Sequence, residues 1–235
     1  MKELIQKMFT EAGYNICDDA AEKLSVYMDG ILEYNQHVNL TSITDPEEFI
    51  TKHYLDSASI SSLSEFQDAG TIIDVGTGGG FPGVPLAVLF PEKKFTVEDS
   101  LQKRIRVIQD LLSRAGIENV EAVHARAEDL GKDPVHREQY DLCISRAVSR
   151  MSVLAEYCLP FVKPGGFFIS YKGSDLEKEL GEGKKAVQVL GGEIDRVQPA
   201  GVEGMQHQFV VVKKVKHTPK KYPRKAGTPG KTPIR

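Results

Sequence analysis

Hydrophobic residues recur at helical spacing in the first part of the chain. Residues 2–12 and 18–34 each show this pattern, through Leu4, Ile5, Met8 and Phe9 and then Leu24, Met28, Ile31 and Leu32. Positions three and four apart share one face of an α-helix, so both segments are predicted as amphipathic helices. Asp45 followed by Pro46 is a helix-start signal, and a third helix carrying His53 is expected after it.

From residue 71 onward, short apolar runs alternate with helical segments. Seven runs are predicted as strands, at 71–74, 94–99, 120–124, 140–145, 167–171, 193–197 and 208–215. The helices expected between them include 101–115, 148–162 and 175–190. This alternation predicts an α/β fold with a mostly parallel seven-stranded sheet and an antiparallel last strand. The expected organisation is a helical extension over 1–66, the α/β domain over 67–215 and a tail over 216–235.

The sequence DVGTGGGFPG, which ends the first predicted strand, is the strongest candidate for a ligand site. Its glycines can adopt positive φ and carry no Cβ, so a ligand can lie directly against the main chain. Pro82 suits the first turn of a helix behind the loop. Strand, loop and helix N-terminus together form a nucleotide-sized cradle. A glycine-rich surface loop is the alternative interpretation.

Two glycine spacings overlap in this loop. Gly76, Gly78 and Gly80 fit the loop of methyltransferases that use S-adenosylmethionine. Gly78, Gly80 and Gly83 fit the dinucleotide-binding fingerprint instead. Asp74 favours the first spacing, because its carboxylate can reach the amino-acid end of S-adenosylmethionine and would repel a pyrophosphate.

Further candidates for chemistry stand where the predicted strands end. Asp99 ends the second strand, where an acid can accept hydrogen bonds from ribose hydroxyls. Residues 126–129 (RAED) form the loop that contacts the adenine edge in a doubly wound sheet. Arg146 and Lys172 end two later strands, at the edge where open α/β folds bind ligands. Lys172 is equally interpretable as a surface lysine, and His53 as a structural histidine rather than a substrate contact.

Composition narrows the class of protein. The chain has 235 residues and is 40% hydrophobic, enough for one main domain with an appendage. Its cysteines, Cys17, Cys143 and Cys158, form no CxxC pair, so neither a disulfide framework nor a metal site is expected. The N-terminus lacks a signal-peptide core, and no segment reaches the roughly 20 apolar residues of a membrane span. A cytoplasmic protein without membrane contact is expected.

Charge is distributed unevenly along the chain. The net charge is −3, but all 33 acids lie at or before Glu203, whereas nine of the 30 Lys and Arg lie after it. Residues 1–203 therefore carry −12 and the last 32 residues carry +9. A basic tail of this kind indicates contact with a polyanion, most commonly nucleic acid. Its prolines favour an extended conformation when free, and a solvated, disordered terminus is the alternative.

These motifs occur in the order found in one protein family. DVGTGGGFPG, VEDS, RAED, SRAV, VKPGG and YPRKAGTPGKTP follow one another, and NLTSIT and KHYLDS precede them. Over nearly its whole length, the chain resembles the small-subunit ribosomal RNA methyltransferase G family, also called glucose-inhibited division protein B. DVGTGGGFPG and KHYLDS are the specific motifs, whereas VKPGG is general to class I methyltransferases.

The resemblance implies a Rossmann-like class I S-adenosylmethionine-dependent methyltransferase that modifies N7 of one guanine in 16S rRNA. The expected partner is 16S rRNA or the 30S subunit, and a monomer is expected. Together with the loop analysis, it assigns cofactor binding to Asp74, Gly76, Gly78, Gly80, Phe81, Asp99, Ala127, Glu128 and Arg146. RNA contacts are expected from His53, Lys172, His207, Lys220, Lys221, Arg224 and Lys225. His207 stands where relatives commonly have an arginine, so a weaker contact is expected there.

The expected chemistry asks little of the protein. Guanine N7 has an in-plane lone pair and no proton to lose, so no general base is needed and catalysis is mainly positioning. Methylation leaves a positive charge on the guanine. The expected catalytic residues, Arg146 and Lys172, are therefore assigned as phosphate or O6 ligands rather than proton acceptors. The main alternative is an RNA-binding assembly factor without turnover, and a more distant one is an NAD-linked dehydrogenase.

Overall fold

The structure is a computed structural model that describes residues 1–146, 149–173, 176–202 and 207–234. Within these ranges, seven strands form one sheet in the order β3-β2-β1-β4-β5-β7-β6. The strands are β1 (Thr71–Val75), β2 (Lys94–Asp99), β3 (Val120–His124), β4 (Tyr140–Arg146), β5 (Val162–Lys172), β6 (Gly192–Pro199) and β7 (Gln208–Lys214). The predicted α/β class and the number of strands are confirmed.

The direction of the strands also follows the prediction. β7 pairs antiparallel with both β5 and β6, whereas the other described pairs are parallel. β5 begins at Val162, earlier than expected, because the VKPGG segment stays in the sheet. Its pairing with β4 shifts register between Tyr140 and Leu142, which accommodates the extra residues as a bulge.

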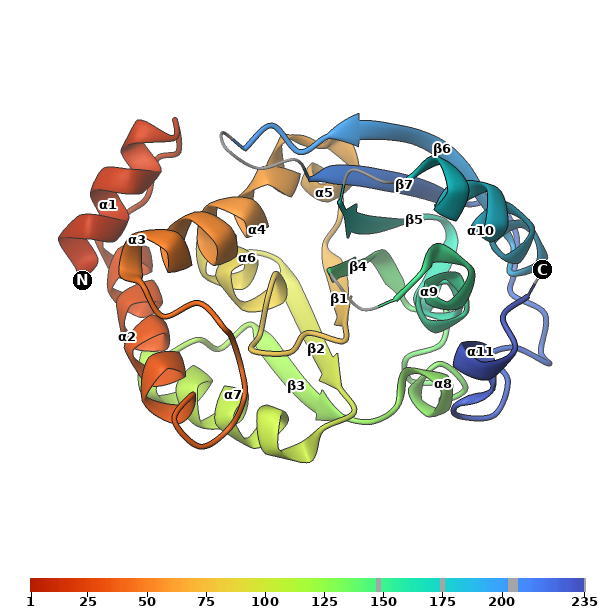
Figure 1. Cartoon of the computed structure of the whole chain (residues 1–235), viewed down its shortest axis with the longest axis horizontal. Helices are drawn as coiled ribbons and strands as arrows, with labels where there is room; N and C mark the ends of the chain where they lie inside the picture. The colour runs from red at the N-terminus through yellow and green to blue at the C-terminus, as the bar shows by residue number, and fades with distance from the viewer. Residues whose placement is uncertain (147–148, 174–175, 203–206, 235) are drawn as a thin grey trace.

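Helices cover both faces of the sheet (Figure 1). The α-helices are α1 (Lys2–Glu11), α2 (Asp18–Tyr34), α3 (Pro46–Phe49), α4 (Asp56–Ala58), α5 (Ser64–Gln67), α6 (Gly83–Leu89), α7 (Gln102–Ala115), α8 (Ala127–Leu130), α9 (Met151–Cys158), α10 (Glu177–Val189) and α11 (Thr228–Lys231). A π-helix, η1 (Ile50–Leu55), and two 3-10 helices, η2 (Ser59–Ser62) and η3 (Leu159–Phe161), complete the described set. None of the described helices is long and apolar enough to cross a membrane.

Most predicted helices are confirmed, with changes at their ends. The helices expected at 148–162 and 175–190 are observed as α9 and α10. Their expected first residues, Val148 and Asp175, lie outside the described part of the chain. α9 gives way to η3 at Leu159, because Pro160 lacks the amide hydrogen that an α-helix needs there.

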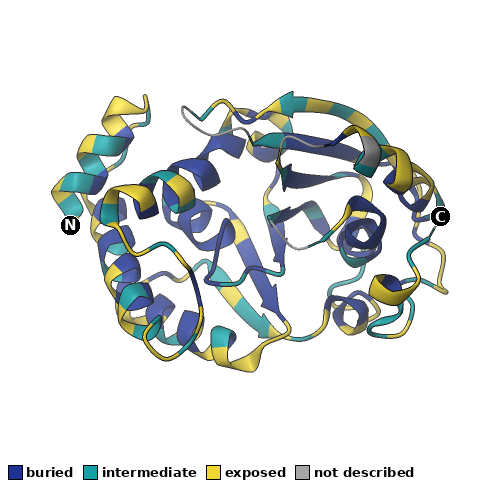
Figure 2. Cartoon of the chain, in the orientation of Figure 1, coloured by how far each residue is buried: buried dark blue, intermediate teal, exposed yellow. Residues whose placement is uncertain are grey.

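The N-terminal extension shares a hydrophobic core with the α/β domain. Buried side chains of α1, α2 and η1 pack in one cluster with those of α6 and α7. Tyr27 of α2 is fully buried and donates a hydrogen bond to the carbonyl of Gly79 at 2.9 Å. The extension is therefore packed directly against the glycine loop, and Figure 2 shows the contacting helix faces as buried.

The third predicted helix is composite. Asp45 caps α3 by accepting a hydrogen bond from the amide of Glu48 at 2.9 Å, and Pro46 opens the first turn. The helix then widens into η1 before it continues as α4. A π-helical turn is rare and often marks a functional site, so the segment that carries His53 is a place to look for one.

The C-terminal tail is docked on the domain, whereas the extended conformation was predicted for a free tail. Arg137 binds it by donating hydrogen bonds to the carbonyls of Thr218 and Tyr222, both at 2.8 Å. Pro223 and Pro229 are buried, and α11 lies beside α9 (Figure 1). Buried prolines and specific carbonyl acceptors hold the tail, and net charge and proline content do not reveal either.

Candidate active site

The glycine loop joins β1 to α6 at the carboxyl edge of the sheet. Gly76, Gly78 and Gly80 have φ angles of 72°, 62° and 92°, which glycine adopts without the penalty of a side chain. A Cβ on Gly78 would meet no described atom within 4 Å, whereas one on Gly80 would lie 2.2 Å from the hydroxyl of Tyr27. Gly78 therefore faces open space, and Gly80 permits close packing against α2.

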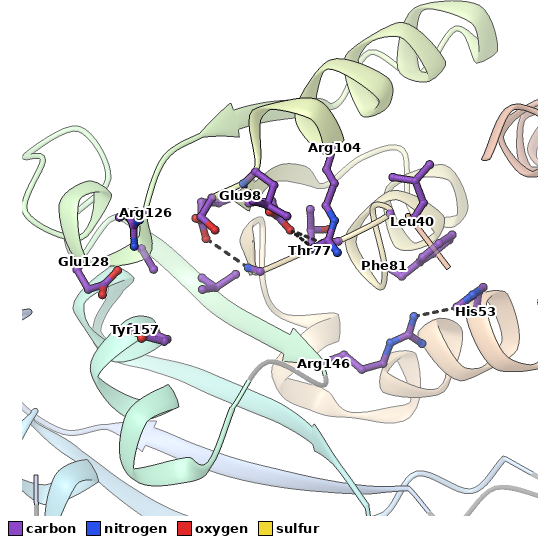
Figure 3. Close-up of a pocket in the computed structure, with 18 of the residues that line it drawn as sticks. Leu40, His53, Thr77, Phe81, Glu98, Arg104, Arg126, Glu128, Arg146 and Tyr157 are labelled. Atoms are coloured by element: carbon purple, nitrogen blue, oxygen red, sulfur yellow. Dashed lines mark hydrogen bonds and ion pairs between the residues drawn. The ribbon is translucent and has the colours of Figure 1, made fainter. Parts of the chain in front are cut away.

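A cavity of about 610 Å³ opens beside this loop (Figure 3). It brings together seven of the predicted cofactor residues: Gly76, Gly78, Phe81, Asp99, Ala127, Glu128 and Arg146. Arg126 of the predicted adenine loop also lines it, as do residues that the sequence analysis did not assign to a ligand, among them Thr77, Glu98, Arg104, Tyr157 and Gly227. The predicted candidates Asp74 and Gly80 are not among its lining residues. The separate strand-end signals thus converge on one site.

Asp74 lies buried under the loop. Its Oδ2 accepts hydrogen bonds from Thr77 Oγ1 at 2.6 Å and from the amide of Gly83 at 2.9 Å. Its Oδ1 has no hydrogen-bond partner in the described part of the chain. Burial raises the pKa of Asp74 to about 6. A buried carboxylate oxygen left over in this way suits an acceptor for a ligand ammonium group or a bridging water.

Two acids from the end of β2 form the floor of the cavity. Asp99 Oδ2 accepts a hydrogen bond from the amide of Gly78 at 3.0 Å and lies 3.2 Å from Arg104 Nη1. Glu98 Oε2 accepts one from the amide of Gly76 at 3.3 Å. Burial, with the neighbouring acids, raises the pKa of Glu98 to about 8. The floor therefore combines an Asp99 that fixes the loop with a Glu98 that is protonated at neutral pH.

The far end of the cavity is formed by α8 and the C-terminal tail. Ala127 and Glu128 lie at the start of α8 and line the cavity, as does Tyr157 from α9. Glu128 Oε1 accepts a hydrogen bond from the amide of Gly227 at 2.7 Å. The tail thus reaches the predicted adenine-binding residues, a contact for which the local sequence carries no signal.

The opposite end of the cavity is formed by Arg146 and the N-terminal extension. Arg146 Nη1 donates to Asp56 Oδ2 at 2.6 Å and to the carbonyl of Lys52 at 3.1 Å, and Nη2 lies 3.4 Å from His53 Nδ1. Its guanidinium carbon lies 5.9 Å from the centre of the Phe81 ring, within range of a cation–π interaction. The wide turn of η1 and the start of α4 therefore present three acceptors to one guanidinium.

His53 supports this arrangement as a neutral side chain. Its ring stacks on Phe81 with centroids 4.3 Å apart and planes 4° apart. Burial and the positive charge of Arg146 lower the pKa of His53 to about 3. Because Nδ1 faces the Arg146 donor, the proton lies on Nε2, which is 2.7 Å from Thr41 Oγ1. His53 lines the cavity and positions the arginine and the phenylalanine on either side of it.

His207 contacts Asp56, the carboxylate that holds Arg146, from outside the cavity. Its Nδ1 lies 2.8 Å from Oδ1 of Asp56, which is fully buried. Burial raises the pKa of Asp56, but the hydrogen bond from His207 and the charge of Arg146 outweigh it, and the net pKa is lowered. His207 is not among the cavity-lining residues; it orients the carboxylate that orients Arg146. Asp56 was not assigned to the site from the sequence, although it lies in KHYLDS, one of the two specific family motifs.

The other predicted catalytic and RNA-binding residues divide into two groups. Lys172 donates to Glu179 Oε1 at 2.6 Å and to the carbonyl of Ser149 at 2.5 Å, and it is not among the cavity-lining residues. Arg224 is paired with buried Glu156. Exposed side chains remain at Lys220, Lys221 and Lys225. The structure therefore separates the basic residues that hold the fold from those that face solvent.

The strand order, the antiparallel β7, the glycine loop after β1 and the cavity at the carboxyl edge define a class I S-adenosylmethionine-dependent methyltransferase fold. Solved structures agree. The fibrillarin pre-rRNA processing protein of Methanococcus jannaschii matches with a TM-score of 0.55 and 15% identity, over 71% of this chain and 77% of that one. The mitomycin 7-O-methyltransferase MmcR matches with a TM-score of 0.54 and 14% identity, over 69% and 54%.

Sequence comparison identifies the particular family. A family model described as rRNA small subunit methyltransferase G matches residues 20–209. The Ribosomal RNA small subunit methyltransferase G of Alkaliphilus metalliredigens is 45% identical, over 100% of this chain and 99% of the relative. The protein of that name from Lactobacillus helveticus is 46% identical, over 93% of each. The chain belongs to the rRNA small subunit methyltransferase G family, and the resemblance seen in the motifs is confirmed.

Proposed function

We propose that this protein transfers a methyl group from S-adenosylmethionine to N7 of one guanine of 16S rRNA. The observation that carries the proposal is the convergence of the glycine loop, Asp99, Glu128 and Arg146 on one cavity. Family membership supports small-subunit rRNA as the substrate, and the class I fold supports the cofactor. The assignment of N7 as the modified atom rests on the resemblance and on the lone pair that guanine N7 carries.

The residues present suit the cofactor. Bound S-adenosylmethionine supplies a methyl group on a positively charged sulfur. The carboxyl groups of Asp99 on the floor and of Glu128 at the far end of the cavity favour a cation, and the loop at Gly78 leaves its main chain accessible. Asp74 offers a buried carboxylate oxygen with no partner in the described chain. Asp99 is held by the loop and by Arg104, so it is oriented before a ribose hydroxyl arrives.

Arg146 is the residue we assign to the target base. Guanine N7 carries a lone pair and no proton, so the reaction needs no base, and His53 is already neutral. A guanidinium suits the guanine O6 and N7 edge or an adjacent phosphate. Held by the N-terminal extension, Arg146 contributes by placing the base rather than by moving a proton.

Lys172 contributes from outside the cavity. Its ammonium group binds Glu179, whose Oε1 also accepts the amide of Met151 at 2.6 Å. This fixes the start of α9, the helix that carries Tyr157 to the cavity. The exposed Lys220, Lys221 and Lys225 are assigned to RNA phosphates, where they provide affinity without reading sequence.

The test is methyl transfer from labelled S-adenosylmethionine to unmodified 30S subunits and to naked 16S rRNA. Borohydride and aniline then cleave RNA at 7-methylguanine. We expect one labelled guanine that is also a cleavage site, in at least one of the two substrates. Label without cleavage would contradict N7 as the acceptor. Cofactor binding without label in either RNA would favour a non-catalytic assembly factor.

A further inference from the structure

The C-terminal strap, residues 216–234, makes two separate attachments beside the cavity. One is Gly227, which lines the cavity and donates its amide to Glu128 at 2.7 Å. Glu128 is only 5% exposed, so this hydrogen bond forms in a largely dehydrated place. The orientation of a predicted adenine-side carboxylate thus depends on whether the strap is docked.

The second attachment is the pairing of Arg224 with Glu156. The amide and Nε of Arg224 donate to Oε1 at 2.7 and 2.9 Å, and Nε and Nη2 donate to Oε2 at 3.1 and 2.6 Å. Glu156 is fully buried on α9, and its neighbour Tyr157 lines the cavity. Four hydrogen bonds to one buried carboxylate make this a strong and directional attachment.

These contacts separate the strap's basic residues by role. The donors of Arg224 are directed at Glu156, and its side chain is 27% exposed. Lys220, Lys221 and Lys225 are exposed on the same strap. Arg224 is three residues from Gly227, so we expect the loss of its attachment to loosen the segment that contacts Glu128. The lysines can be changed without touching either attachment.

We propose that the C-terminal strap is a wall of the cofactor pocket and that Arg224 is a positioning residue for cofactor binding, not an RNA ligand. Arg224 acts through Glu156, which fixes the strap on α9, and Gly227 then sets the Glu128 carboxylate at the cavity. This inference rests on the proposed function, because it concerns the same pocket. The strap would then serve cofactor binding through Arg224 and Gly227 as well as RNA binding through its lysines.

The experiment measures the affinity of the full-length protein for S-adenosylmethionine by calorimetry and for 16S rRNA by filter binding. We expect Arg224→Ala to weaken cofactor binding about tenfold, a usual size for coupling between a docked segment and a ligand. RNA affinity should change less than about twofold, since the residues assigned to RNA phosphates, Lys220, Lys221 and Lys225, are kept. Arg224→Lys should fall between, because a lysine cannot reproduce the planar set of donors.

Two further variants keep the result interpretable. Arg224→Ala leaves Glu156 buried without a cation, so Arg224→Ala/Glu156→Gln removes that charge and keeps the fold measurable. Arg114→Ala is the matched control, because it removes an arginine that pairs with exposed Glu33 on α2. It should leave both affinities unchanged.

The outcomes separate this proposal from the proposed function. Cofactor affinity that is unchanged in the double variant would overturn the strap proposal while leaving the methyltransferase assignment intact. An equal loss of cofactor and RNA affinity would also overturn it, because Arg224 would then serve general stability. A wild-type protein that fails to bind S-adenosylmethionine would contradict the proposed function itself.

Discussion

The two ends of the cavity are built by the two ends of the chain, in different ways. At one end, the N-terminal extension holds Arg146 with Asp56, and that extension is packed through a hydrophobic core that includes fully buried Tyr27. At the other end, the C-terminal strap holds Glu128 through Gly227 and is fastened by hydrogen bonds to buried carboxylates and by buried prolines. The end assigned to the base is thus held by a hydrophobic core, and the end assigned to adenine is closed by a segment that is docked through specific side-chain partners.

Glu98, on the cavity floor between the two ends, gives the largest expected effect, a change in the free energy of unfolding with pH. The pKa of Glu98 is raised to about 8, so its contribution to stability is present in full below the unfolded pKa and is lost as pH rises through 8. Between about pH 5 and pH 8, wild type should lose roughly 4 kcal/mol more of its free energy of unfolding than Glu98→Gln. Urea unfolding of both proteins across this pH range measures the difference. Parallel plots of the free energy of unfolding against pH would contradict the prediction.

Removing Arg146 tests the core-packed end. Arg146→Ala should lower kcat roughly a hundredfold, the usual loss for one preorganised donor. The affinity for S-adenosylmethionine should change by less than about threefold, since most cofactor contacts lie elsewhere. Single-turnover transfer and calorimetry give the two numbers. Equal losses in both would show that Arg146 is a cofactor ligand first.

Changing Asp56, the carboxylate that holds Arg146, tests the same end of the cavity without removing the arginine. Asp56→Asn keeps the size of the side chain but removes its charge, so we expect kcat to fall about tenfold, as for weakening one hydrogen bond to a charged group. Cofactor affinity should be retained. Asp110→Asn, which alters an exposed pair with Arg114, is the control. An equal effect of the two substitutions on kcat would refute a special role for Asp56.

The strap's lysines give the smallest effect. Replacing Lys220, Lys221 and Lys225 by Gln should reduce the slope of log affinity for RNA against log salt by about 2, since each phosphate contact contributes roughly 0.7. Lys7→Gln/Lys23→Gln, on α1 and α2 across the molecule from the strap (Figure 1), should leave the slope unchanged. Binding curves at several salt concentrations provide the measurement. A slope that the triple variant retains would assign the RNA contact elsewhere.

The sequence predicted the sheet and one half of the site well, for a physical reason. β-branched runs, glycines with positive φ and acids at strand ends are local features, and parallel strands bring their carboxyl ends to one edge. Asp99 and Arg146 were found in this way. Lys172 was placed at the correct strand end, but its ammonium group turns toward Glu179 on α10, which strand position alone does not reveal.

The rest of the site depends on distant partners. Asp56 and Arg146 are 90 residues apart in sequence, and Glu128 and Gly227 are 99 apart. Net charge alone does not distinguish Arg224 from its lysine neighbours. The carboxylate that pairs with Arg224 belongs to Glu156, which lies 68 residues earlier in the sequence. Side-chain pairing across such separations is decided by packing, and no local pattern in one sequence encodes it.

The π-helix η1 constrains how this family member can change. A π-turn contains one more residue than an α-turn, and in an α-helix each residue adds a rotation of about 100°. Deleting one residue between Lys52 and Asp56 would relax the turn and rotate these two residues relative to each other. The carbonyl and the carboxylate would then no longer meet one guanidinium. The number of residues between Lys52 and Asp56 is therefore constrained as well as the identity of the side chains, and we expect a single-residue deletion there to disrupt the support of Arg146.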